Sequence, residues 1–145
     1  MSNSDNVAVE FLSLLAHIRD NYFKPAEQIA RSQLSPTQFH AISILYRKGS
    51  LPMSELAADM KISKQQLTPI IARLNESNLV IRKSDNNDRR VVRIELNEPG
   101  RTIYKSLFAR IKTNFIEKLS EIPDDELDEL MQMVTRMQEI LRSAK

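Results

Sequence analysis

Residues 53–74 restrict the possible folds of this chain more than any other segment. The sequence MSELAADMKISKQQLTPIIARL places apolar side chains where the two helices of a helix-turn-helix pack together. Ala57 stands where only a small side chain lets those helices cross closely. Ser63, followed by Gln66 three residues later, has the spacing of a capping box, so the second helix is predicted to begin after Ser63. The apolar positions are Leu56, Ala57, Met60, Ile62, Leu67 and Ile70.

The predicted start of the second helix decides which of its side chains face outward. Glutamine can form paired hydrogen bonds with adenine, whereas lysine and arginine suit guanine or phosphate. Pro69 is the exception to a regular helix, since it removes a backbone hydrogen bond to Gln65. Either the helix begins earlier and bends, which keeps Leu67 in the core, or it begins at Thr68; the first is preferred. The outward set is Lys64, Gln65, Thr68 and Arg73, with Gln66 close by.

A β-hairpin is predicted directly after the helix-turn-helix. Residues 79–83 and 91–96 read as strands, because β-branched residues are frequent and the second strand alternates. The joining loop, Asp85–Arg90, is rich in Asp and Asn, which tolerate turn geometry. A helix-turn-helix followed by such a hairpin is a winged helix. The fold class predicted is therefore mostly α with a small β-hairpin wing.

Further helices are predicted on both sides of this segment. They cover about 7–22, with Pro25 marking a kink or break, then 36–48, 52–60, 98–119 and 123–143. The helix 98–119 has an apolar stripe, and the last helix has heptad spacing typical of a coiled-coil seam. The terminal helices can pack on each other or on a second copy of the chain, and the seam favours a second copy. The stripe is Tyr104, Phe108, Ile111, Phe115 and Leu119, and the seam is Leu127, Leu130, Val134, Met137 and Leu141.

Positive charge is concentrated around the predicted winged helix. Residues 61–93 contain eight Lys/Arg against three Asp/Glu, although the whole chain has a net charge of only +2. Such a concentration indicates binding to a polyanion, with a solvated basic face as the alternative. Arginines beside a turn, as in Arg89 and Arg90, suit a narrow minor groove with its negative potential. Asp88 is expected to hold one of them by a charge-assisted hydrogen bond.

Composition excludes several other kinds of function. The chain has no cysteine, so disulfides, thiolate metal sites and thiol nucleophiles are absent. No nucleophile–base pair and no Asp/Glu/His cluster at metal spacing is visible, so neither an enzyme nor a cofactor is expected. No basic leader and no long apolar run is present, which indicates a cytoplasmic protein without membrane contact.

Three segments together resemble the MarR family of bacterial transcriptional regulators. They are LSPTQFHAISIL, SELAADMKISKQQLTPIIARLNESNLVIR and DNNDRRVVRIELNEPG, which cover about residues 34–100. Asp88 and Arg90 in the wing, with the ending at Gly100, are the most specific part. Lys61, Asn78 and Asn97 depart from residues usual in the family, and Pro69 stands where a basic or polar residue is common.

The resemblance implies a homodimer that binds a palindromic site on double-stranded DNA. It divides the chain into dimerisation helices at 1–33 and 98–145 and a DNA-binding lobe at 34–97. It also implies regulation by a small aromatic or phenolic ligand that releases the protein from DNA. The protein is therefore expected to be a repressor. The alternative is a winged helix that serves as a protein-interaction module. The expected DNA-binding residues are Lys64, Gln65, Gln66, Thr68, Arg73, Asp88, Arg89 and Arg90.

Overall fold

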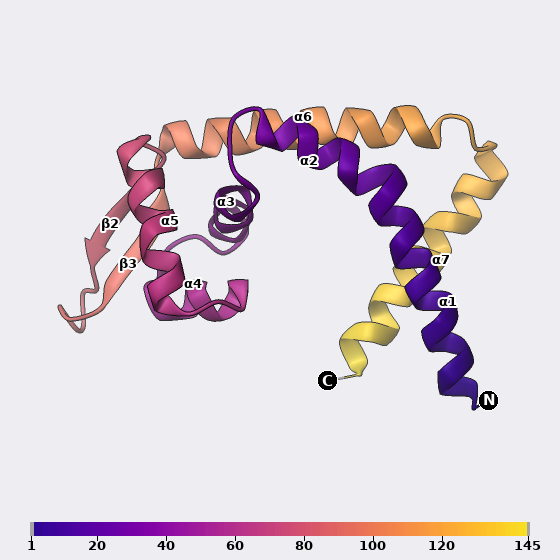
Figure 1. Ribbon diagram of the computed structural model, residues 1–145, viewed down its shortest axis with the longest axis horizontal. Coiled ribbons are helices and arrows are strands. Elements are labelled where there is room, and N and C mark those ends of the chain that lie inside the picture. Colours follow the sequence, from indigo (N-terminus) through magenta and orange to yellow (C-terminus); the bar gives the residue numbers. More distant parts are fainter. Residues whose placement is uncertain (1, 145) are drawn as a thin grey trace. The chain divides into compact units, whose positions relative to one another are not determined.

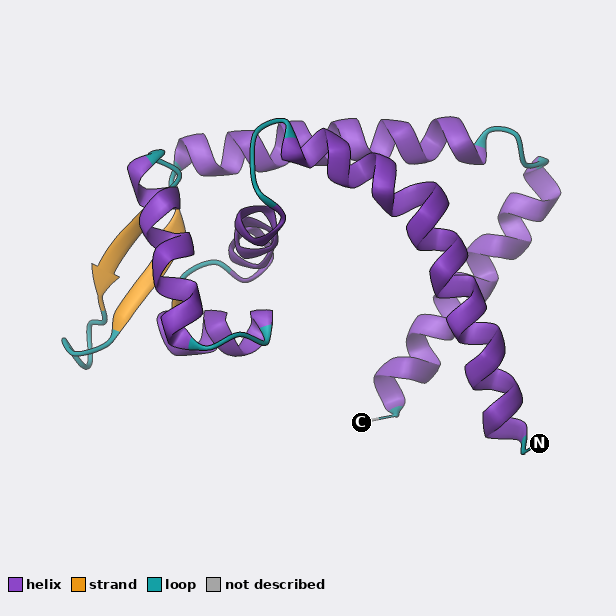
Figure 2. Ribbon diagram, in the orientation of Figure 1, coloured by secondary structure: helices purple, strands orange, loops and turns teal. Residues whose placement is uncertain are grey.

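The computed structural model describes residues 2–144 and divides the chain into two compact units between Ile111 and Lys112. It is mostly helical with one small sheet, as predicted (Figures 1 and 2). The order of elements is α1 (Asn3–Ile18), the π-helix η1 (Arg19–Phe23), α2 (Lys24–Arg31), α3 (Pro36–Lys48), β1 (Leu51–Pro52), α4 (Met53–Met60), α5 (Lys64–Glu76), β2 (Val80–Ser84), β3 (Val92–Leu96), α6 (Glu98–Leu119) and α7 (Asp124–Ser143).

The hydrophobic core of the first unit lies among α3, α4, α5, the sheet and the beginning of α6. Ala57 is buried where α4 meets α5, as the helix-turn-helix spacing predicts. These contacts hold α5 and the hairpin together. Residues 34–97 are called the winged-helix lobe below. The largest fully buried side chains are Ile42, Leu45, Leu56, Leu67, Ile71, Leu74, Ile94 and Leu107.

Local sequence signals account for most of the helix ends. Ser35 and Gln38 form a capping box at α3, and Ser63 and Gln66 form a second at α5. Lys61, in place of the usual glycine, has a left-handed backbone with φ of 56°, and Asn78 has φ of 58°. Asn tolerates this conformation better than most residues. For Lys61 the left-handed backbone is energetically unfavourable, but it lets the chain turn between α4 and α5.

The sheet has three strands rather than the two that were predicted. β1 pairs antiparallel with β3, and β3 pairs antiparallel with β2, so the order is β1-β3-β2. Pro52, which was expected in the helix, lies in β1 and pairs with Arg93 of β3, and α4 begins at Met53. β2 lies against α5, and the loop 85–91 extends from the lobe beyond the strands (Figure 1). β2, β3 and this loop, the wing loop, form the wing.

Two details of the flanking helices add to what was expected. The first helix passes through η1, where the N–H of Lys24 bonds to the carbonyl of Arg19, and continues as α2, so the helix changes type directly before Pro25, where a kink or break was predicted. Pro25 has no N–H for the regular pattern, which gives a local reason for the altered turn. On α6, the fully buried side chain is Leu107, one residue before Phe108, which is largely exposed.

The helices near the ends of the chain bury little. Neither α1 nor α7 contains a buried residue, although both have apolar side chains at helical spacing. α7 begins after Pro123, and three acidic residues in its first turn favour the positive end of the helix dipole. Among the described residues, no helix is both long and apolar enough to cross a membrane.

Candidate nucleic-acid interface

The capping box at Ser63 fixes which side chains α5 presents. The N–H of Gln66 donates to Ser63 Oγ at 3.1 Å, and α5 then runs without interruption to Glu76. The earlier start is therefore confirmed, with Pro69 inside the helix. Leu67, Ile71 and Leu74 are buried on one side. The other side exposes Lys64, Gln65, Gln66, Thr68 and Arg73.

Two of these exposed side chains already have partners, one at the N-cap of α5 and one within the helix. The Oε1 atom of Gln66 accepts from the backbone N–H of Ser63 at 2.9 Å and from its hydroxyl at 3.3 Å. A paired bond to adenine needs that same oxygen, so Gln66 could form it only by opening the capping box. Thr68 Oγ1 donates to the carbonyl of Lys64 at 2.9 Å. Gln65 forms no side-chain hydrogen bond with other described residues.

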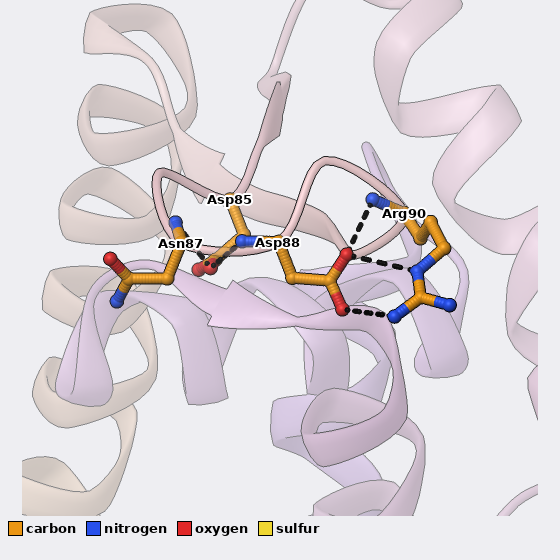
Figure 3. A network of polar contacts seen from close by, with 4 residues as sticks. All are labelled: Asp85, Asn87, Asp88 and Arg90. Atoms are coloured by element: carbon orange, nitrogen blue, oxygen red, sulfur yellow. Dashed lines mark hydrogen bonds and ion pairs between the residues drawn. The ribbon is translucent and has the colours of Figure 1, made fainter.

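The wing loop is organised by two aspartates (Figure 3). Asp85 Oδ2 accepts from the backbone N–H groups of Asn87 at 3.0 Å and Asp88 at 3.1 Å, which is an Asx-type turn. Asp88 in turn accepts from Arg90: from its backbone N–H at 3.0 Å, from Nε at 3.2 Å and from Nη2 at 3.3 Å. The expected bond between Asp88 and a wing arginine is thus present in the structure, and the arginine is Arg90.

These bonds set the charge state of both aspartates. The backbone N–H groups of Asn87 and Asp88 lower the pKa of Asp85, and Arg93 lowers it further. The side chain of Arg90, followed by its backbone N–H, lowers the pKa of Asp88. Both carboxylates are therefore charged at neutral pH. Arg90 is nevertheless 92% exposed, so its remaining N–H groups can reach another acceptor.

The cations of the basic segment fall into two groups. Lys83 pairs with Glu95 at 2.6 Å, and Arg93 pairs with Asp85 at 3.2 Å. No ion pair forms at the others, within the part of the chain that the structure describes, apart from Arg90 with Asp88. The exposed set without an internal carboxylate is Lys61, Lys64, Arg73, Arg82 and Arg89. Exposed cations without a carboxylate partner therefore lie on both α5 and the wing.

Sequence reasoning counted Arg93 only as part of the basic segment and missed its internal partners. Its alternation with buried Ile94 predicts an outward side chain, which no local signal contradicts. In the structure, its guanidinium also bonds to Ser50, 43 residues earlier in the chain. Only a long-range contact reveals that role.

Aromatic rings gather where α3 meets α6. The rings of Tyr46 and Tyr104 have centroids 4.3 Å apart. Phe39 and Phe108 lie 6.0 and 5.9 Å from Tyr104. Such spacing is favourable for aromatic pairs and stabilises the packing of α6 on the lobe. As for metals, none of the residues described forms a cluster of three or more His, Cys, Asp or Glu side chains suited to an ion.

Comparison with known proteins agrees with this arrangement. The model of the MarR family matches residues 34–92. The homoprotocatechuate degradative operon repressor of Escherichia coli is 29% identical over 119 residues, 82% of this chain and 76% of that protein. A MarR family protein from Bacillus stearothermophilus has the same fold, with a TM-score of 0.84, 25% identity, and coverage of 98% of this chain and 99% of that one. NadR in complex with 4-hydroxyphenylacetate superposes with a TM-score of 0.65 at 17% identity, covering 96% and 99%.

The family match, the relatives and the fold lead to one assignment. A regulator is favoured over a protein-interaction module, because the matched family and the named relative are regulators of transcription. Residues 34–92 match the MarR family, and the chain as a whole resembles the DNA-binding transcriptional regulators of that family rather than an enzyme.

Proposed function

We propose that this regulator binds a palindromic operator as a homodimer, with α5 in the major groove and the wing in the adjacent minor groove. The observation that carries the proposal is Arg90, which Asp88 holds through Nε and Nη2 while the Arg90 side chain remains 92% exposed. An exposed cation gains little stability from such a bond, since surface ion pairs contribute at most about 1 kcal/mol. A fixed orientation is useful if the group must enter a narrow groove.

On α5, the roles follow from what each side chain leaves free. Gln65 has its whole amide available and is proposed to read a base edge, whereas Lys64 and Arg73 suit phosphate or guanine. Thr68 can still accept a hydrogen bond through its hydroxyl oxygen. Gln66 is proposed to act mainly by fixing the start of α5, with its amide NH₂ left for DNA. In the wing, Arg89 is proposed to enter the minor groove together with Arg90, and Asp88 orients Arg90.

The proposed dimer is supported by apolar surface that the single chain leaves exposed. On α7 the heptad residues Val134 and Leu141 are 43% and 54% exposed. On α1, Leu12 and Leu15 are exposed as well. Regulators of this family bind DNA as dimers, and segments 1–33 and 98–145 are proposed to supply the dimerisation lobe. Two copies would then present two winged-helix lobes, residues 34–97, to one duplex.

We also propose that the protein is a repressor that a small aromatic or phenolic ligand releases from DNA. Support comes from the E. coli relative, named a repressor of homoprotocatechuate degradation, and from NadR, whose structure holds 4-hydroxyphenylacetate. Addition of these two phenolic acids to the protein–operator complex should raise the dissociation constant if either class of ligand is used. Unchanged binding across a panel of such compounds would remove this part of the proposal.

The direct test of the wing assignment is the salt dependence of operator binding. Arg90→Ala is expected to weaken binding about tenfold and to reduce the slope of log K against log salt by about one phosphate contact. Arg136→Ala, on exposed α7, is the control and should change neither quantity. If Arg90→Ala leaves affinity and slope unchanged, the wing does not bind DNA as proposed.

A further inference from the structure

Arg93 differs from the other cations of the wing because all three nitrogen atoms of its guanidinium donate hydrogen bonds within the chain. Nε donates to Ser50 Oγ at 3.1 Å and Nη2 to the Ser50 carbonyl at 2.9 Å. Nη1 donates to Asp85 Oδ1 at 3.2 Å. Arg93 and Asp85 have side-chain exposures of 32% and 19%, the lowest for both members of any ion pair among the described residues. Arg93 is therefore poorly placed to meet DNA itself.

The bonds of Arg93 continue to the tip of the wing. Asp85 accepts from Arg93 with one oxygen and from the backbone N–H of Asp88 with the other. Asp88 then holds Arg90. Hydrogen bonds through Arg93, Asp85 and Asp88 thus connect Ser50, which directly precedes β1, to the exposed guanidinium of Arg90. Figure 3 shows its outer part, from Asp85 to Arg90.

The strand register explains why the wing needs such a connection. Arg93 pairs with Pro52 of β1 on one side and with Lys83 of β2 on the other. Beyond Arg93 toward the loop, β3 pairs with β2 alone, through Val92 and Ser84. A two-stranded ribbon is only marginally stable and twists freely. Arg93 therefore sits where the three-stranded sheet becomes a ribbon, and its bond to Asp85 ties the first residue of the loop to the lobe.

We propose that Arg93 is a positioning residue, which through Asp85 holds the wing loop in the orientation that lets Arg90 meet DNA. The inference rests on the proposed function, since it requires that Arg90 bind DNA. It differs from a direct role of Arg93 in binding phosphate, and it differs from a general role in stability. In the first of those cases, Arg90 would contribute equally whether or not Arg93 is present. In the second, loss of Arg93 would lower the contribution of residues on α5 as well as that of Arg90.

A double-mutant cycle between Arg93 and Arg90 separates these cases. Operator affinity is measured for the full-length wild type, Arg93→Gln, Arg90→Ala and the double variant. Because a displaced wing cannot use Arg90, Arg93→Gln alone should weaken binding about as much as Arg90→Ala, roughly tenfold. The double variant should be little weaker than either single variant. Penalties that multiply, to about a hundredfold, would overturn the inference.

Lys83→Gln is the matched control, because Lys83 lies directly opposite Arg93 and also loses one ion pair, with Glu95. Its effect should multiply with that of Arg90→Ala. A second cycle pairs Arg93→Gln with Arg73→Ala on α5. These two effects should also multiply, whereas general loss of folding would reduce the contribution of Arg73 as well as that of Arg90 and so contradict a role confined to the wing.

Two further variants keep the test decisive if Arg93→Gln folds poorly. Asp85→Asn removes the same ion pair from the other side, and Arg93→Lys keeps the charge but not the fork that bonds Ser50 and Asp85 together. Both should lower the contribution of Arg90 in the same cycle. If Arg90→Ala has no effect in the wild type, it is the proposed function of the wing that fails. If it has its full effect in every background, the inference about Arg93 fails alone.

Discussion

Apolar residues are buried in the winged-helix lobe but exposed on the helices α1 and α7. In the lobe, residues such as Ile42, Leu67 and Ile94 are fully buried within the single chain. In α1 and α7, no residue is buried. Isolated amphipathic helices of this length gain most of their stability from packing of the apolar face. The lobe thus has its core in one chain, whereas the two helices leave apolar surface that a partner can cover.

The largest expected effect comes from placing charge on the seam of α7, which tests whether a partner covers the exposed apolar residues. Val134→Glu combined with Leu141→Glu should raise the dissociation constant of the proposed dimer by about 100-fold or more, since burial of each such side chain contributes about 1.5–3 kcal/mol. Sedimentation at micromolar concentration measures the change. Gln132→Glu, on the opposite side of the heptad, should leave association unchanged. A wild-type chain that is monomeric under these conditions would contradict the dimer.

A smaller effect sharpens the other side of the comparison, the stability of the lobe itself. A Cβ at Gly100 would lie 2.1 Å from the carbonyl oxygen of Leu79, at the base of the wing. Gly100→Ala should therefore lower the free energy of unfolding by about 1–3 kcal/mol, because backbone must move. Thr102→Ala, exposed on the same helix, is the control. Denaturant unfolding measures both, and equal stabilities would show that α6 does not approach the wing so closely.

Two adjacent residues of α5 test whether an exposed polar side chain serves the fold or the DNA. Gln65→Ala should cost about 1–3 kcal/mol in discrimination at one base pair, since its amide is free. Gln66→Ala should instead lower stability by about 0.5–1 kcal/mol through loss of the capping box, with a smaller change in base preference. Binding to a set of singly substituted operators, together with thermal unfolding, distinguishes them. The reverse pattern would assign base reading to Gln66.

The smallest expected effect concerns pH and the wing loop. The folded-state pKa of Asp85 and of Asp88 is lowered from 3.8, so the stabilisation from their hydrogen bonds is present above that value and is lost as pH falls through the lowered pKa. Carboxyl NMR signals should titrate below 3.8, and the pKa of Asp85 should rise in Arg93→Gln. Titration of Asp85 at its ordinary value in the wild type would show that the loop is not held in this way.

Local chemistry made much of the lobe predictable from sequence. Ser63 with Gln66 three residues later gave the start of α5. The bond between Asp88 and Arg90 followed from residues two apart. Each of these signals lies within a few residues of the feature it specifies, so it can be recognised without the rest of the fold.

Features set by distant contacts were not predictable in the same way. β1 has two residues, and only its pairing with β3 makes it a strand. Arg93 looks like any exposed cation of an alternating strand until Ser50 is brought to it from 43 residues away. Similarly, helical spacing on α6 selected Phe108, whereas the position of α6 against the lobe buries Leu107.

The most direct test of the whole account is a hydroxyl-radical footprint of the purified protein on its tightest operator, with the stoichiometry measured on the same duplex. We expect two copies per duplex and two protected half-sites about 34–36 Å apart, each with protection in the minor groove beside it. A single protected site occupied by one copy, or protection that omits the minor groove, would contradict it.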